Sequence, residues 1–132
     1  MERQRRIFTL LGIYNLKNMM QELEKQAYIF SVETIGLAKS LEKEDAQKEL
    51  AGRLKQAAGK VYTLLTDALS AEENKDFADL FRESHQRAKE ALDHLKKSRF
   101  EDSGLNEKKA ELTGMAEDII ERMNTILGKI IY

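Results

Sequence analysis

The sequence predicts an all-α protein, an antiparallel up-down four-helix bundle with an extended first helix. None of the 132 residues is proline, a residue that costs roughly 3 kcal/mol inside a helix, so its absence favours long uninterrupted helices. No run alternates apolar and polar residues in the manner of a strand, and no Asn-Gly or Asp-Gly pair marks a hairpin. Apolar residues instead recur every three or four positions, which gives each predicted helix one apolar face in need of a partner surface.

Length and composition predict a single domain over residues 1–132. The hydrophobic fraction of 42% can fill one core, and the net charge of −1 gives no global preference for nucleic acid. The absence of cysteine excludes disulfides, thiol nucleophiles and thiolate metal sites. A chain without cysteine also fits a cytoplasmic location, which we take as the expectation.

Four helices are expected, over about residues 3–40, 42–69, 71–97 and 107–131. The start of the second has only acidic residues in its favour. Short connections between successive helices predict that neighbours run antiparallel.

Capping signals support two of the helix starts. Ser70 and Glu73 have the spacing of a capping box, in which the hydroxyl accepts from an N–H of the first turn and the carboxylate accepts from the backbone N–H of the capping residue. Asn106 follows the clearest loop, residues 99–106, and is placed to cap the last helix.

The second, third and fourth helices each have a predicted core face. These faces comprise Leu50, Leu54, Ala57, Ala58, Val61, Leu65 and Ala68; Phe77, Leu80, Phe81, Ala88, Ala91, Leu92 and Leu95; and Leu112, Met115, Ile119, Met123, Ile126 and Ile130.

The first helix has more apolar residues than a one-sided helix needs. We interpret residues 1–22 as an apolar N-terminal helical extension, because apolar side chains between Ile7 and Met20 surround most of the helix. Burial against another chain is the favoured interpretation, since an exposed apolar patch of that size is poorly tolerated on a monomer. The candidate oligomer-interface residues are Ile7, Phe8, Leu11, Tyr14 and Met19.

The N-terminal extension has two alternative interpretations. It could pack within its own bundle, or lie in a membrane surface, because the first twenty residues carry four basic groups and one acidic group. The apolar run is too short to cross a bilayer, and Asn15, Lys17 and Asn18 interrupt it in a way that a signal peptide would not. Membrane association is therefore the less favoured alternative.

The sequence contains no recognisable catalytic, cofactor or metal motif. A carboxylate-bridged metal site in a bundle needs Glu three residues before His on two helices, but Arg82 precedes His85 and Ala91 precedes His94 at that spacing. Ser84 and His85 are adjacent and point in different directions on a helix. We therefore interpret both histidines as ordinary surface or boundary residues and expect no enzymatic activity, no cofactor and no metal.

Two glycines seven residues apart lie within the second predicted helix. Gly52 and Gly59 each weaken a helix interior relative to alanine. Either close packing inside the bundle or close approach to a partner would account for them. Both predict that a bulky side chain at Gly59 would clash.

Lys75, Arg82, Lys89 and Lys96 form a basic stripe along the third predicted helix, at successive seven-residue intervals. Such a stripe could follow a phosphate backbone. An acidic stripe runs one position further on, so a solvated face of mixed charge is the simpler interpretation.

A second candidate basic site is the N-terminal cluster of Arg3, Arg5 and Arg6.

Three runs carry a resemblance to a known family. Residues 53–58 (RLKQAA) are similar to a Gln-Leu-Arg-Arg-Ala-Ala run, residues 75–81 (KDFADLF) to Lys-Lys-Asp-Phe-x-x-Phe-Leu, and residues 121–127 (ERMNTIL) to Gly-Arg-Met-Leu-x-x-Leu-Ile. Over residues 24–131 the chain thereby resembles the four-helix-bundle family of the rRNA intervening-sequence proteins. That family includes the accessory variability protein of diversity-generating retroelements. Residues 64–68 (LLTDA) depart from its Asn-Ile-Ala-Glu-Gly segment.

The resemblance implies a small homo-oligomeric bundle, often a pentameric ring, without enzymatic activity. Its retroelement branch binds a reverse transcriptase and nucleic acid. We therefore expect a non-enzymatic adaptor or scaffold whose partner is a reverse transcriptase or a structured RNA. The alternative is direct nucleic-acid binding through the basic stripe.

Overall fold

The computed structural model describes residues 14–130, which form an all-α, antiparallel four-helix bundle. The helices are α2 (Tyr14–Leu41), α3 (Lys48–Ser70), α4 (Asn74–Lys97) and α5 (Ser103–Leu127), and a short 3-10 turn, η1 (Asp45–Gln47), precedes α3. No strand occurs between residues 14 and 130. The predicted fold class is confirmed, and α2 is the longest of these helices at 28 residues. Its predicted start at residue 3 lies outside the described residues.

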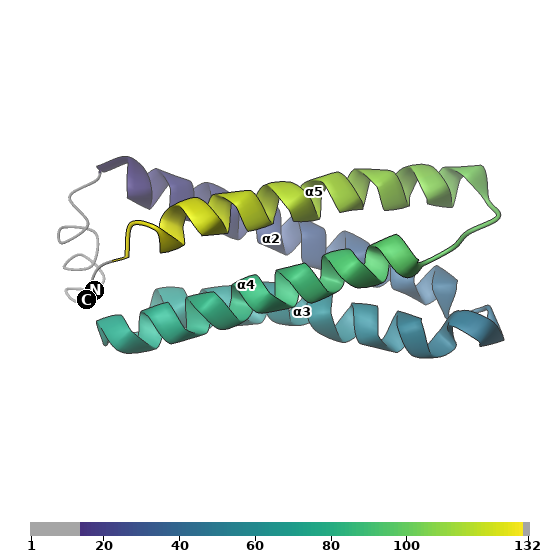
Figure 1. Cartoon of the computed structure of the whole chain (residues 1–132), viewed down its shortest axis with the longest axis horizontal. Helices are drawn as coiled ribbons and strands as arrows, with labels where there is room; N and C mark the ends of the chain where they lie inside the picture. Colours follow the sequence, from purple (N-terminus) through teal and green to yellow (C-terminus); the bar gives the residue numbers. More distant parts are fainter. Residues whose placement is uncertain (1–13, 131–132) are drawn as a thin grey trace.

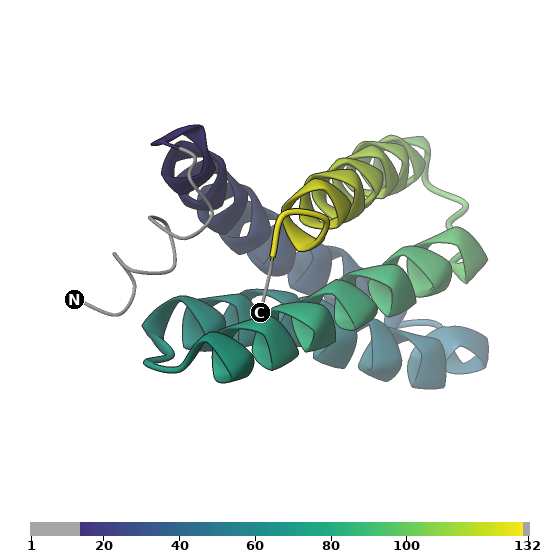
Figure 2. The same cartoon turned by 60° about the vertical axis from the view of Figure 1, so that its left-hand side comes forward.

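Each helix packs mainly against two others. α3 packs against α4, α2 against α3, α4 against α5, and α2 against α5, which closes the bundle. Figure 1 shows α5 in front of α2 and α4 in front of α3. In Figure 2, α3 and α4 lie side by side along the base, and α2 and α5 cross above them. Both α2 and α5 therefore keep one side free of neighbouring helices.

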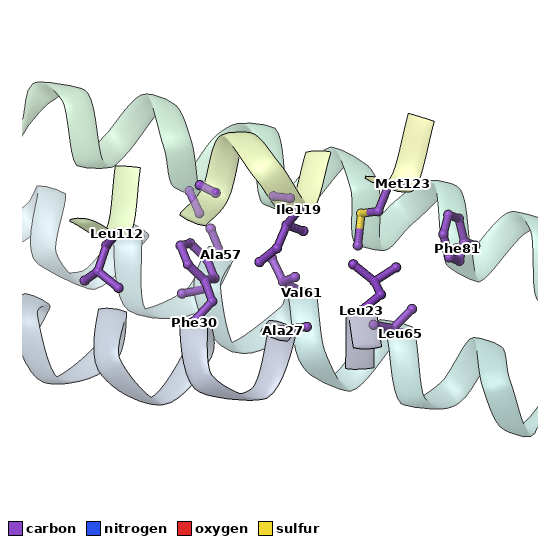
Figure 3. Close-up of a cluster of buried hydrophobic side chains, with 14 of the residues drawn as sticks. Leu23, Ala27, Phe30, Ala57, Val61, Leu65, Phe81, Leu112, Ile119 and Met123 are labelled. Atoms are coloured by element: carbon purple, nitrogen blue, oxygen red, sulfur yellow. The ribbon is translucent and has the colours of Figure 1, made fainter. Parts of the chain in front are cut away.

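The core lies along the axis of the bundle and is built from the faces that the three-to-four spacing predicts. Figure 3 shows side chains of α2, α3 and α5 meeting there, with Phe30, Val61 and Ile119 among them. All three have no accessible surface, and burial of a side chain of this size contributes about 1.5–3 kcal/mol. The predicted core residues that are only partly buried are Leu50, Leu80, Leu92, Met115 and Ile130.

Both predicted capping signals are wrong. Ser70 is the last residue of α3, and Glu73 is the N-cap of α4 without a capping bond from its side chain. At the start of α5 the N-cap is Asp102, whose Oδ1 accepts from the backbone N–H of Leu105 at 2.9 Å. Asn106 lies in the first turn and donates from Nδ2 to the carbonyl of Phe100 at 2.6 Å. α5 therefore begins four residues earlier than predicted.

The second predicted helix also begins later than expected, at Lys48 instead of residue 42, because η1 and a turn occupy residues 42–47. The side-chain amide of Gln47 holds this connection in place. Its Nε2 donates to the carbonyl of Arg99 at 2.7 Å, and its Oε1 accepts from the N–H of Arg99 at 2.8 Å. Two loops at the same end of the bundle are thereby joined (Figure 1).

Candidate interaction surface

Part of the apolar excess near the N-terminus is covered by the chain's own core. Leu16 and Met20 are buried, and Met19 is half-buried and packs against that core. Leu16, Met19 and Met20 therefore pack within their own bundle, which was the first of the two alternative interpretations. Met19 keeps part of its surface accessible, and its place in an oligomer interface stays a prediction.

The remaining predicted interface residues lie where the structure describes no side chain. Ile7, Phe8 and Leu11 precede residue 14, and the side chain of Tyr14 is likewise outside the described part.

The exposed apolar surface of the described chain lies further along α2. Its large exposed hydrophobic side chains are Tyr28, Ile29 and Val32, which are 53%, 45% and 52% accessible. The ring of Tyr28 meets that of Tyr62 on α3 edge to face, with centroids 5.2 Å apart. We call Tyr28, Ile29 and Val32 the α2 patch. The periodicity of the sequence did not reveal the α2 patch, because its residues stand in the same apolar stretch as core residues of α2.

A shallow hollow of about 400 Å³ adjoins the α2 patch. Glu24, Lys25, Tyr28, Ile29 and Tyr62 line it. Its lining therefore combines three large apolar or aromatic side chains with one charge of each sign. Such a hollow can receive an apolar side chain while the charged groups at its rim stay in water.

The sides of α2 next to α5 are occupied by polar links. Gln26 donates from Nε2 to Oδ2 of Asp118 at 2.7 Å, and Lys108 donates to Glu33. The bond to Glu33 raises the pKa of Lys108 above its usual value, against a smaller opposing effect of burial. These links hold α2 against α5, and the α2 patch lies outside them, with only Tyr28 of its three residues in ring contact with α3.

Neither glycine singled out in α3 is tightly packed. A Cβ built on Gly52 meets nothing within 4 Å, and one on Gly59 lies 3.8 Å from Cδ1 of Ile35, an ordinary contact. Close packing inside the bundle is therefore not the reason for Gly52. At Gly59 a methyl group fits, and only a larger side chain would have to displace Ile35.

The basic stripe is exposed along its whole length on α4. Lys75, Arg82, Lys89 and Lys96 all face solvent, and Nη1 of Arg82 lies 3.7 Å from Oδ1 of Asp79. The neighbouring Asp76 and Glu83 are exposed as well. The α4 surface thus has the mixed charge that the simpler interpretation describes.

The second basic candidate, Arg3, Arg5 and Arg6, lies outside the described residues.

His85 differs from the expected surface or boundary histidine, because it is buried, with 8% of its surface accessible. Burial lowers its pKa below the ordinary 6.5, the charge of Lys89 adds to this, and a hydrogen bond with Asn124 of α5 opposes it. The adjacent Ser84 donates its hydroxyl hydrogen to the carbonyl of Val61 at 2.6 Å. This hydroxyl joins α4 to α3 and does not face His85 as a nucleophile would.

Residues 14–130 contain neither a metal cluster nor a membrane-spanning helix. No group of three or more His, Asp or Glu side chains there could hold a metal ion. No helix in this part of the chain is both long enough and apolar enough to cross a bilayer.

Comparisons of the chain with family models, with curated proteins and with solved structures find no match. The candidate sites are therefore ranked by their geometry. The α2 patch is the feature of the described surface that the bundle itself leaves unexplained.

Proposed function

We propose that this chain is a non-enzymatic, homo-oligomeric four-helix-bundle adaptor or scaffold. The observation that carries the proposal is the α2 patch, three large apolar side chains close together on one helix that each keep about half of their surface accessible. Apolar residues gathered in one place on a surface mark an association site more often than isolated ones do. The resemblance to the rRNA intervening-sequence family, whose members self-associate, supports the same proposal.

The strength of such an association follows from the exposed fractions. Each side chain of the α2 patch is about half accessible, so covering it contributes about 1 kcal/mol, half the value for full burial. Two copies together would contribute about 6 kcal/mol before other contacts and before the cost of association. With the cost of association offset by the other contacts of the interface, a net free energy of about 6 kcal/mol corresponds to a dissociation constant of about 40 µM.

An adaptor needs surfaces left over for its partner. Association through α2 leaves α4 and the outer side of α5 accessible in every copy, and a symmetric assembly repeats them. The partner class we propose is a reverse transcriptase or a structured RNA, as the family resemblance implies. The proposed location is the cytoplasm, which the absence of cysteine fits.

The test is multi-angle light scattering on wild-type protein between about 1 and 300 µM, a range that brackets the expected affinity. We expect a concentration-dependent mass above that of the monomer. Val32→Glu should shift the protein to monomer with its helical circular dichroism unchanged, because Val32 is exposed. Gln56→Glu, an exposed site on α3, is the control for the added charge. A wild-type protein that stays monomeric throughout contradicts the proposal.

A second candidate function is direct nucleic-acid binding through the basic stripe, favoured by the exposure of Lys75, Arg82, Lys89 and Lys96 on one side of α4. Four phosphate contacts predict a slope of about −3 to −4 for the logarithm of the binding constant against that of the salt concentration. The double variant Arg82→Glu with Lys89→Glu should abolish RNA binding, and Lys60→Glu on α3 should not. Unchanged binding by the double variant excludes this surface.

A further inference from the structure

The outward face of α2 has a regular sequence of its own. Six exposed residues follow one another at alternating spacings of three and four, which keeps them in one line along a helix. This line lies on the opposite side of α2 from the buried residues Leu23, Ala27 and Phe30. We call the six residues the outer seam: Glu22, Lys25, Ile29, Val32, Gly36 and Lys39.

The outer seam is complementary to its own reverse. About the midpoint between residues 30 and 31, Ile29 mirrors Val32, Lys25 mirrors Gly36, and Glu22 mirrors Lys39. Turned end for end, the seam therefore places apolar against apolar at the centre and opposite charges at both ends. Between the centre and each end, the long side chain of Lys25 faces Gly36, which has no side chain.

We infer that the outer seam binds the outer seam of a second copy of this chain, antiparallel and across a two-fold axis. The inference rests on the proposed function and assigns its interface. In this arrangement Glu22 of each copy faces Lys39 of the other, so one ion pair forms at each end. A closed pair of this kind uses the same face twice, whereas a ring joins two different faces. The ring that the resemblance implies would need a further interface.

The charges select the direction of pairing. A parallel pair would place Glu22 against Glu22 and Lys39 against Lys39, and like charges repel. Neither residue forms an ion pair within residues 14–130, so both side chains are available to a second copy.

Gly36 supports the same direction. A Cβ built on it would meet nothing within 4 Å, so the packing of its own bundle does not require glycine there. Glycine in a helix interior is unfavourable relative to alanine. Its place one turn after Val32 gives the aliphatic stem of Lys25 of the second copy room to lie against the helix. Gly52 and Gly114 have the same open surroundings but no exposed large apolar neighbour.

The hollow beside the α2 patch fits this register. Lys25 and Ile29 belong both to the outer seam and to the lining of the hollow. When Ile29 pairs with Val32 of the second copy, the Val32 side chain of that copy lies at the edge of the hollow. The two-fold axis produces the same contact on the other copy. Ile29 and Val32, two of the three residues of the α2 patch, are thereby covered on both copies at once.

The first experiment uses the absence of cysteine from the chain. Glu22→Cys and Lys39→Cys each carry a single thiol, and the two positions lie about 25 Å apart along one helix. The two variants, distinguished by different affinity tags, are mixed and treated with a short bis-maleimide. We expect cross-linking between position 22 of one copy and position 39 of the other, and little cross-linking in either variant alone.

The remaining outcomes separate the inference from the proposed function. Cross-linking of position 22 to position 22 means a parallel pair and overturns the inference. An oligomer that gives no cross-link at either position has its interface elsewhere, which overturns the inference and leaves the proposed function standing. A wild-type protein that is monomeric overturns both.

The second experiment exchanges the charges. Glu22→Lys places two like charges at each end of the pair and should weaken dimerisation at least about ten-fold, from two lost and two repulsive contacts. Adding Lys39→Glu to the same chain should restore the wild-type dissociation constant, measured by analytical ultracentrifugation. Glu121→Lys, the same change at an exposed site on α5, should have no effect. Failure of the double variant to recover overturns the antiparallel register.

Discussion

Replacing Gln47 by alanine tests how the two loops at one end of the bundle are held together. Its side-chain amide forms two hydrogen bonds with the backbone of Arg99, at 2.7 and 2.8 Å, across 52 residues of sequence. A hydrogen bond contributes about 0.5–1.5 kcal/mol net, and Arg99 is exposed, so water replaces part of what is lost. We expect Gln47→Ala to lower the free energy of unfolding by about 1–2 kcal/mol. For a chain of this length that is a fall in Tm of about 3–8 °C.

The assay is urea unfolding followed by circular dichroism, with Gln56→Ala as the control. Gln56 is exposed in the middle of α3, and the same chemical change there should alter stability by less than about 0.5 kcal/mol. Gln47→Glu retains an acceptor for the N–H of Arg99 but turns a second oxygen toward its carbonyl. It should therefore destabilise at least as much as alanine. The reasoning would be refuted if Gln47→Ala had the same free energy of unfolding as the wild type, or if Gln47→Glu were more stable than Gln47→Ala.

Three further outcomes follow from particular residues. Phe30→Ala, at a fully buried site, should lower the free energy of unfolding by about 3–5 kcal/mol, and a loss below about 1 kcal/mol in urea unfolding would show that the site is not packed. Gly52→Ala should raise stability by about 1 kcal/mol, because the added methyl group meets nothing; a lower Tm would mean that the site is covered. The pKa of His85 is lowered from 6.5 in the fold, so the unfolded chain binds the proton more readily. The stability contributed by this residue is complete above pH 6.5 and is lost as the pH falls below that value. Replacement by glutamine should reduce the difference between urea midpoints at pH 5.5 and 7.5, and an unchanged difference would exclude His85 as its source.

The start of α5 shows why local signals were insufficient. Asp102, Ser103 and Asn106 all suit an N-cap, so the sequence offered several starting points within one turn. The choice depends on contacts from elsewhere. Phe100 packs against the core, and Nζ of Lys109 donates to the carbonyl of Ser98 at 2.5 Å. These contacts fix the path of the loop, and the carboxylate of Asp102 then lies nearest to the free N–H of Leu105.

His85 illustrates the same limit for a titratable side chain. Histidine has no strong preference for surface or core, and its neighbours on α4 are of both kinds. Its burial follows from the approach of α5, which brings Asn124 to its ring. Because that approach is a property of the assembled bundle, the sequence of α4 alone does not contain it.

By itself the sequence determined that the chain folds as four amphipathic helices, and it identified most of the core. The reason is that a spacing of three or four residues leaves one possible apolar face on each of α3, α4 and α5. On α2 apolar residues occupy two faces, and the pattern does not say which face is covered. Only the tertiary structure decided this, because α3 and α5 pack on the side of Leu23 and Phe30. Tyr28, Ile29 and Val32 are left facing water, as the surface that a second chain can cover.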